Sequence, residues 1–328
     1  MAHIKGQNVN LLTKIGTSYV PIAASRSCDL TITANNEDAA AKDDHGDGLF
    51  DNPDFVNYSW SASNESYVVD VAYLGTLLSN VLSGDRKLDV QFQVGGKGGS
   101  QKKALTKKGE AFISNLSVDA TNGSFATISL SLEGNGTLSD GTFVESTTVS
   151  ELKKRIKGKA LMVAIDTSTQ PQSHVWKTIA CATSHKLNIS VSLSDITDKD
   201  YNDSAVYKEV TGISVSLSTD NLIDDISNTA TLHGAGLADL YSLVTTGKAI
   251  AVEFGYYPDS IGSDVHQYGA GTGAGYAEGD TVLLTGIFTC TNVSINGANK
   301  EDATFSAEFS NKGAVTVSAA AASALSEE

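Results

Sequence analysis

The chain has few of the residues that mark disulfide-bonded, metal-bound or membrane-spanning proteins. Its 328 residues include three cysteines, Cys28, Cys181 and Cys290, which are too few and too scattered for a disulfide framework or a zinc ribbon. No apolar run reaches the roughly 18 residues of a membrane helix, and the N-terminal residues lack the apolar core of a signal peptide. We therefore expect reduced thiols in a cytosolic compartment, no membrane contact, no metal and no cofactor.

Basic residues are also in the minority. The 23 Lys and Arg residues face 38 Asp and Glu residues, which gives a formal net charge of −15. Such a surface repels phosphate and argues against a protein that grips nucleic acid. The chain is nevertheless 41% hydrophobic and 19% charged, a composition typical of a folded protein rather than a disordered one.

Proline and methionine are scarce, with 4 and 2 residues, whereas glycine is frequent at 30. Val, Ile, Thr, Ser and Phe recur in alternating runs, as in antiparallel sheets with one buried and one polar face. A helical bundle or a parallel nucleotide-binding fold would show different periodicities. The composition and the alternation predict a mainly β protein.

A long internal repeat is the most informative pattern in the sequence. Residues 22–43 align without gaps with residues 179–200 and share 8 of 22 positions, and residues 109–136 share 8 of 28 positions with residues 286–313. The tripeptide at 4–6 also recurs at 156–158, and the matching blocks keep their order. This self-similarity predicts a tandem duplication of one domain.

Each copy reads as about seven strands and one short helix. Alternating apolar residues, such as Leu30 and Ile32 in the first copy and Leu187 and Ile189 in the second, predict half-buried strands. The helix in each copy carries one apolar stripe and is followed by a glycine. The stripe consists of Leu74, Leu77, Leu78, Val81 and Leu82 in the first copy and of Leu237, Leu240, Tyr241 and Val244 in the second.

We predict two tandem β-sandwich or β-barrel domains, each with one short flanking helix. The first domain spans residues 1–138, a linker follows at 139–155, the second domain spans 156–317, and 318–328 form a flexible tail. Trp60 and Trp176 lie in strand-like contexts, which favour core packing over ligand stacking.

No group of residues predicts an active site or a metal site. The acidic stretch at 42–54 matches a calcium loop at Asp43, Asp47 and Gly48, but His45 and Asp54 stand where other ligands are required and no helices flank it. A solvated loop is the better interpretation. The six histidines lack metal-ligand spacing, and the glycine-rich run at 269–275 lacks the Lys-Ser/Thr of a phosphate loop.

Two long polar loops, at 35–56 and 194–208, are the candidate functional segments, because loops this long in compact domains are usually functional or disordered. Two similar halves in one chain can also make head-to-tail contacts that close into a ring. We expect the loops to contact neighbouring rings. The candidate residues are Asp43, Asp44, Asp47, Phe50, Asp54 and Phe55 in the first loop and Asp198, Asp200 and Tyr201 in the second.

The order of motifs resembles the major tail tube proteins of long-tailed (siphovirus-like) bacteriophages, in a duplicated two-domain form. The opening IKGQNVNLLTKIG leads to the strand SCDLTITA, the acidic loop ends in YSWSAS, and the Leu-rich helix precedes KLDVQFQV. The similarity covers most of residues 1–136, and the second copy repeats it less faithfully.

This resemblance implies a non-enzymatic virion protein whose rings stack into a hollow tail tube, the conduit for DNA ejection. Three duplicated subunits would form a pseudo-hexameric ring. The implied partners are further copies of the chain, a tail tip or initiator complex, a tape-measure protein and a tail terminator, with assembly in the host cytoplasm. Double-stranded DNA would pass without specific binding, since an acidic lining repels it.

Three other functions remain open from the sequence. The subunit of a contractile injection or secretion tube has a similar fold but generally a single domain. A tandem carbohydrate-binding or adhesive sandwich would suit the glycine-rich loops and exposed aromatics such as Tyr256, Tyr257, Tyr268 and Tyr276, although the chain shows no secretion signal and no evident aromatic platform. An enzyme is the least supported alternative.

Overall fold

The computed structural model describes most of both sequence repeats. The described residues are 6–15, 17–22, 24–38, 53–82, 86–95, 103–144, 155–167, 176–179, 181–196, 204–223, 235–257 and 281–318. We call residues 6–144 the first half and residues 155–318 the second half. The predicted tail at 318–328, apart from Ser318, and the glycine-rich run at 269–275 lie outside the described residues.

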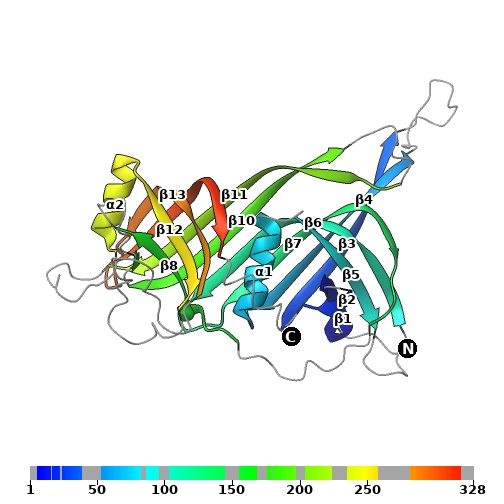
Figure 1. The fold of residues 1–328 in the computed structure, drawn as a ribbon, viewed down its shortest axis with the longest axis horizontal. Helices are drawn as coiled ribbons and strands as arrows, with labels where there is room; N and C mark the ends of the chain where they lie inside the picture. The colour runs from blue at the N-terminus through cyan, green and yellow to red at the C-terminus, as the bar shows by residue number, and fades with distance from the viewer. Residues whose placement is uncertain are drawn as a thin grey trace.

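Most of the described residues lie in β-strands, so the prediction of a mainly β protein is confirmed (Figure 1). The strands of the first half are β1 (Val9–Ile15), β2 (Ser18–Pro21), β3 (Ser25–Asp38), β4 (Pro53–Tyr67), β5 (Lys87–Gly95), β6 (Lys103–Thr121) and β7 (Thr127–Asp140). Those of the second half are β8 (Leu161–Asp166), β9 (Trp176–Thr178), β10 (Ala182–Ile196), β11 (Tyr207–Leu222), β12 (Ala249–Tyr256), β13 (Thr281–Asn296) and β14 (Thr304–Val317).

One helix accompanies each set of strands, as predicted. Helix α1 (Val71–Leu82) begins where the Asp70 carboxylate accepts a hydrogen bond from the Ala72 N–H at 2.9 Å, and α2 (Leu237–Thr246) ends at Gly247 in a left-handed conformation. Neither helix has the length and apolar character needed to cross a membrane.

The two halves have the same strand order. In the first half the hydrogen-bonded neighbours run β2-β1-β5-β6-β7-β4-β3, and in the second half they run β9-β8-β12-β13-β14-β11-β10. All of these pairs are antiparallel. Among the strands that the structure describes, the pair β6 with β10 joins the halves into one 14-stranded sheet.

The repeat extends to the irregularities of the sheet. The β3–β4 ladder shifts register between Asn35 and Asn36, and the β10–β11 ladder shifts at the aligned residues Ser192 and Leu193. The β6–β7 ladder shifts between Ile113 and Asn115, and β13–β14 shifts at the positions aligned with them, 290 and 292. Bulges re-aim the strands they interrupt, so both halves bend at the same points. The duplication event and the domain boundaries themselves stay predictions.

Trp60 shows how the glycines of the sheet serve the core. Its side chain is buried, as predicted, and its Nε1–H donates to the carbonyl of Gly136 at 2.9 Å. A Cβ atom on Gly134 would collide with the indole ring, and one on Gly109 would lie 2.8 Å from it. The ring therefore lies flat on a surface that only residues without a side chain can form.

Two of the long loops are shorter than the sequence suggested. The β3 and β4 strands continue to Asp38 and from Pro53, and β10 and β11 continue to Ile196 and from Tyr207. The strands continue through polar residues because main-chain hydrogen bonds hold the ladder. Side-chain hydrogen bonds add to it, such as the one that the Asn35 amide donates to Asn57 Oδ1 at 2.7 Å.

Candidate assembly interface

The contact between the two halves begins with the β6–β10 ladder. Residues 115–121 of β6 pair with residues 190–184 of β10 in seven consecutive antiparallel pairs. Leu116 lies opposite Ile189 and Val118 lies opposite Leu187, and all four side chains are fully buried. On the other face of the sheet, the Asn115 amide donates to Asn188 Oδ1 at 3.0 Å. The junction thus combines a continuous ladder with an apolar face and a polar face.

Main-chain hydrogen bonds continue the contact between the halves beyond one end of this ladder. The Asn122 N–H donates to the Thr183 carbonyl at 2.8 Å, just beyond the last strand pair. Nearby, the Ala126 N–H donates to Ile156, and the Ile156 N–H donates to Val68 at 2.8 Å. The start of the second half is therefore bound to the core of the first.

The β10–β11 hairpin of the second half reaches across the first half, as the long green strands in Figure 1 show. The N–H of Tyr58 on β4 donates to the Ser204 carbonyl at 2.9 Å, and the Val206 N–H donates back to Tyr58 at 3.1 Å. The Gly136 N–H donates to the Val206 carbonyl at 2.9 Å. Gly136 has a φ of +79°, and a Cβ atom there would lie 2.8 Å from the Tyr207 ring.

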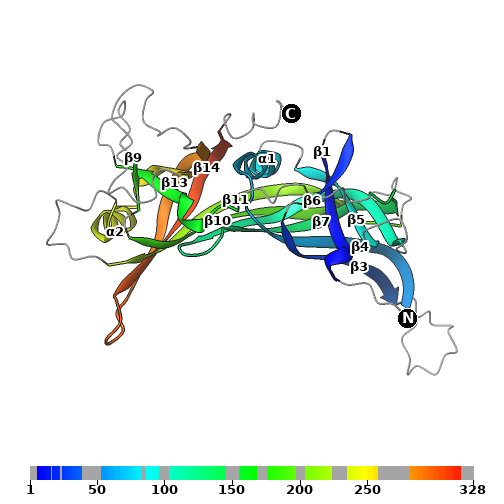
Figure 2. The same ribbon diagram turned by 90° about the horizontal axis from the view of Figure 1, so that it is seen from below.

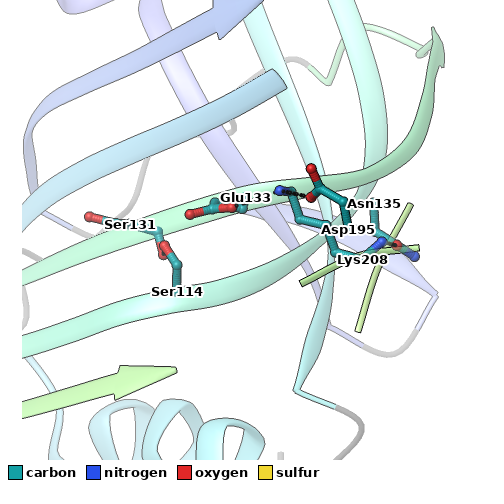
Figure 3. A network of polar contacts seen from close by, with 6 residues as sticks. All are labelled: Ser114, Ser131, Glu133, Asn135, Asp195 and Lys208. Atoms are coloured by element: carbon teal, nitrogen blue, oxygen red, sulfur yellow. Dashed lines mark hydrogen bonds and ion pairs between the residues drawn. The ribbon is translucent and has the colours of Figure 1, made fainter. Parts of the chain in front are cut away.

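Lys208 provides the charged contact of this hairpin (Figure 3). Its ammonium lies 2.7 Å from Asp195 on its own hairpin and 3.1 Å from Glu133 on β7 of the first half. Its main-chain N–H donates to Asn135 Oδ1, whose amide group donates in turn to Glu110. Burial lowers the pKa of Lys208, but the hydrogen bonds and charges of Asp195 and Glu133 outweigh it and leave that pKa raised.

The first half also contributes helix α1 to the contact. The helix lies between the two halves (Figures 1 and 2) and close to β13 and β14 of the second half. Its residues Leu74, Leu78 and Val81 are fully buried. About three turns of helix are not stable alone in water, so the burial of this apolar stripe is what stabilises α1.

His185 lies within the junction, opposite Ala120 of β6. The side chain is 5% exposed, and its Nδ1 atom has no hydrogen-bond partner among the described residues. Burial lowers the pKa of His185 to about 4, against a smaller raising effect from Asp220. The imidazole is therefore neutral at pH 7.

The whole contact is heterologous, because the two halves contribute different elements to it. The first half presents β6, the β4–β7 surface and α1, whereas the second half presents β10, its hairpin with β11, and the β13–β14 surface. No two-fold axis can relate such unlike surfaces. A heterologous contact generates a ring where its rotation closes and a filament where it does not.

Seven of the nine residues that the sequence singled out fall outside the part of the chain that the structure describes. These are Asp43, Asp44, Asp47, Phe50, Asp198, Asp200 and Tyr201. Asp54 and Phe55 lie on strand β4 rather than in a loop, paired with Glu37 and Asn36. The Phe55 side chain is 55% exposed. Their contacts with neighbouring rings stay a prediction.

Two further observations bear on the alternative functions. Tyr257, which the sequence offered as an exposed sugar-binding aromatic, is completely buried, so that expectation is wrong for this residue. Tyr256 is half-buried, and Tyr268 and Tyr276 lie outside the described residues. In the part of the chain that the structure describes, no cluster of three His, Cys, Asp or Glu residues could hold a metal ion.

Comparisons with known proteins give matches at the level of structure alone. No protein-family model matches the chain, and no curated protein does. Among solved structures, the chain is similar to the tail of an empty gene transfer agent (GTA) particle with C6 symmetry, at 17% identity and a TM-score of 0.33. It is also similar to the virion of a native GTA particle, at 16% identity and a TM-score of 0.32. Each match covers 50% of this chain and 98% of the other.

Proposed function

We propose that this chain is a structural tail protein of a phage or a phage-like particle, whose copies form rings that stack into a tube. Three chains, each supplying two similar halves, make one pseudo-hexameric ring. The tube encloses a channel through which double-stranded DNA passes during ejection, and the chain catalyses no reaction. The proposal joins the sequence resemblance to the heterologous junction.

The junction between the halves is the observation that carries the proposal. A single chain already contains two copies of one strand order, joined head to tail by β6 and β10. A chain that repeats this contact with further copies makes a continuous array of halves, and a closed ring is the finite form of such an array. The acidic composition suits a channel, because basic residues in the lumen would hold the DNA by its phosphates.

The segments at 39–52 and 197–203 are the proposed contacts between stacked rings. They carry most of the candidate acidic and aromatic residues, and each follows one of the long strands, β3 or β10. Segments that order on binding lose conformational entropy, which the new contacts must offset. Interactions with an initiator, a tape-measure protein and a terminator would set where the stack begins and ends.

Electron microscopy of the concentrated protein, together with light scattering, tests the ring. End-on views with three-fold or pseudo-six-fold symmetry are the expected result, with a ring mass of three chains. Two-fold dimers, or a monomer at every concentration, would contradict the proposal.

A deletion tests the role of the first segment. Removing residues 43–54 is expected to leave a folded protein that forms rings but no long tubes. Replacing the same residues by a Gly/Ser segment of equal length is the matched control for the shape of the hairpin. Normal tubes from both variants would refute the stacking role.

A further inference from the structure

The repeat allows each face of the internal junction to be compared with its equivalent at the free end of the other half. The equivalent of β10 is β3, and the equivalent of the paired part of β6 is the C-terminal part of β13. If the contact between halves also joins different chains, these two edges should carry the same apolar pattern but lack a partner within the chain.

Strand β3 meets this condition. Among the described residues it pairs only with β4, whereas β10 pairs with both β11 and β6. Ile32 aligns with Ile189 in the sequence repeat; Ile189 is 0% exposed and Ile32 is 54% exposed. Leu30 aligns with the fully buried Leu187 and is only half-buried.

The end of strand β13 meets the condition as well. Strand β12 pairs with β13 only as far as Thr289, and the same edge of residues 290–296 has no partner strand in the described parts of the chain. Ile295 aligns with Val118; Val118 is 0% exposed and Ile295 is 61% exposed, the largest value among the exposed large apolar side chains of the described residues.

Two more features of the internal junction have open counterparts. Tyr241 of α2 is 59% exposed, whereas Leu78, at the matching position of α1, is fully buried. Gly313 shares the positive φ of Gly136, at +94° and +79°. The Tyr207 ring lies against Gly136, but no described atom lies within 4 Å of a Cβ built on Gly313.

We propose that strand β3 of one chain pairs with residues 292–298, the end of β13 and the start of its turn, of a second copy of this chain. The internal ladder sets the register: Leu30 lies opposite Ile295 and Ile32 lies opposite Val293. The same contact brings α2 of one chain against β6 and β7 of the next. This interface rests on the ring proposed above and identifies the surfaces that close it.

The physical reason is that both edges combine free main-chain groups with apolar side chains. An edge strand offers unpaired N–H and C=O groups, and a flat apolar edge is a template for pairing with another chain. Pairing adds a ladder equivalent to the seven pairs of the internal junction and buries Ile32 and Ile295. A like-with-like contact, β3 with β3, has no counterpart within the chain.

Cysteine cross-linking tests the register and the polarity of the contact. In a background of Cys28→Ser, Cys181→Ser and Cys290→Ala, one chain carries Leu30→Cys and another carries Ile295→Cys. Directly opposite residues of a ladder have Cβ atoms about 4.5–5.5 Å apart, close to the separation of a disulfide. After mild oxidation, a covalent dimer is expected in the mixture and not with either chain alone.

The matched control replaces Leu30→Cys by Val20→Cys, because Val20 is 41% exposed on β2 and lies on neither of the two proposed pairing edges, β3 and the end of β13. The control mixture measures cross-linking by random collision. A dimer yield in the test mixture no higher than in the control would overturn the interface. Equal yields from each chain alone would overturn its head-to-tail polarity.

Lysine substitutions repeat the test with the native cysteines in place, in case the cysteine background does not fold. Ile32→Lys and Ile295→Lys change exposed side chains, so both variants should keep the circular dichroism spectrum of the parent. Each should abolish rings, whereas Val20→Lys should not. An equimolar mixture of the two should stop at a 1:1 dimer, because only one intact pair of edges remains.

The outcomes separate the two proposals. Rings that persist in both Ile32→Lys and Ile295→Lys would overturn this interface and leave the ring itself standing. A wild-type chain that forms neither rings nor the Leu30→Cys–Ile295→Cys cross-link would overturn both.

Discussion

Comparing the aligned residues Ile189 and Ile32 measures, within one chain, how much burial in the junction adds to the free energy of unfolding. Ile189 is completely buried opposite Leu116, whereas Ile32 is 54% exposed. Truncating a fully buried Ile to Ala costs about 2–5 kcal/mol, because the lost transfer free energy adds to a cavity. Truncating Ile32 removes roughly half of that burial and leaves no closed cavity, so we expect a loss of about 1 kcal/mol or less.

Urea unfolding of the monomer, followed by circular dichroism, measures both changes in the free energy of unfolding. The denaturant dependence (m value) should match the parent, so that a shift of the midpoint reports stability alone. A double-mutant cycle with Leu116→Ala should show a coupling of about 0.5–3 kcal/mol with Ile189→Ala and none with Ile32→Ala. Equal destabilisation by Ile189→Ala and Ile32→Ala would refute the argument that only one of them lies in a formed junction.

The same Ile32→Ala variant should behave differently in assembly. If the exposed half of Ile32 becomes buried between chains, its truncation removes about 0.8–1.6 kcal/mol from each contact, which corresponds to roughly a 4- to 15-fold higher concentration for ring formation. Light scattering over a concentration series measures that shift, with Val20→Ala as the control. An unchanged assembly threshold would place Ile32 outside the contact.

Other perturbations of the junction have defined outcomes. The pKa of His185 falls from 6.5 to about 4 on folding, so the unfolded chain binds this proton more readily than the folded one. The free energy of unfolding is therefore unaffected by the protonation of His185 above pH 6.5 and falls as the pH drops toward 4. The free energies of unfolding in urea at pH 7 and pH 4.5 should therefore differ by about 2–3 kcal/mol more in the parent than in His185→Leu, and equal differences would contradict this. Gly134→Ala forces a Cβ atom into the Trp60 ring, so it should destabilise the chain by at least about 1–3 kcal/mol and red-shift tryptophan fluorescence. Lys208→Met should lower the free energy of unfolding by only about 1 kcal/mol at low salt, and by less at high salt. The Glu133 and Asp195 side chains are 41% and 57% exposed, so water can hydrate them when the lysine is lost. A loss that does not depend on salt would refute the electrostatic interpretation.

The periodic parts of the fold could be predicted from the sequence because each depends on local patterns. The apolar stripe of α1 and the strand from Lys87 follow from spacing alone, and the hairpin turn at Asn122-Gly123 is signalled by its residue types, with Gly123 at a φ of +82°. The register of β3–β4 and β10–β11 depends on repeated bulges, for which the sequence carried no recognised signal. The extension of these hairpins through polar residues was also missed, because main-chain hydrogen bonds need no apolar pattern.

The junction could not be predicted for a different reason. Leu30 and Ile32 show the same alternation as Leu187 and Ile189, so the sequence assigns both strands the same half-buried environment. The structure gives them opposite environments because only β10 has a first half beside it. Burial here depends on position in the array of halves, which a local pattern cannot encode. The sequence singled out the acidic loops as candidate functional segments instead, because their charge and length can be read directly from it.

The geometry of the internal junction also constrains which assemblies copies of the chain can form. If the contact between chains copies the contact within the chain, one rotation relates every half to the next. A rotation near one sixth of a turn closes three chains into a ring, and a different rotation, or a rise along the axis, makes an open helix instead. The number of halves seen end-on is therefore a measurement of the β6–β10 contact itself. Each chain supplies two halves, so a closed ring of whole chains always contains an even number of them. End-on views of a three-chain ring with three-fold but no pseudo-six-fold symmetry would show that the internal and external contacts differ.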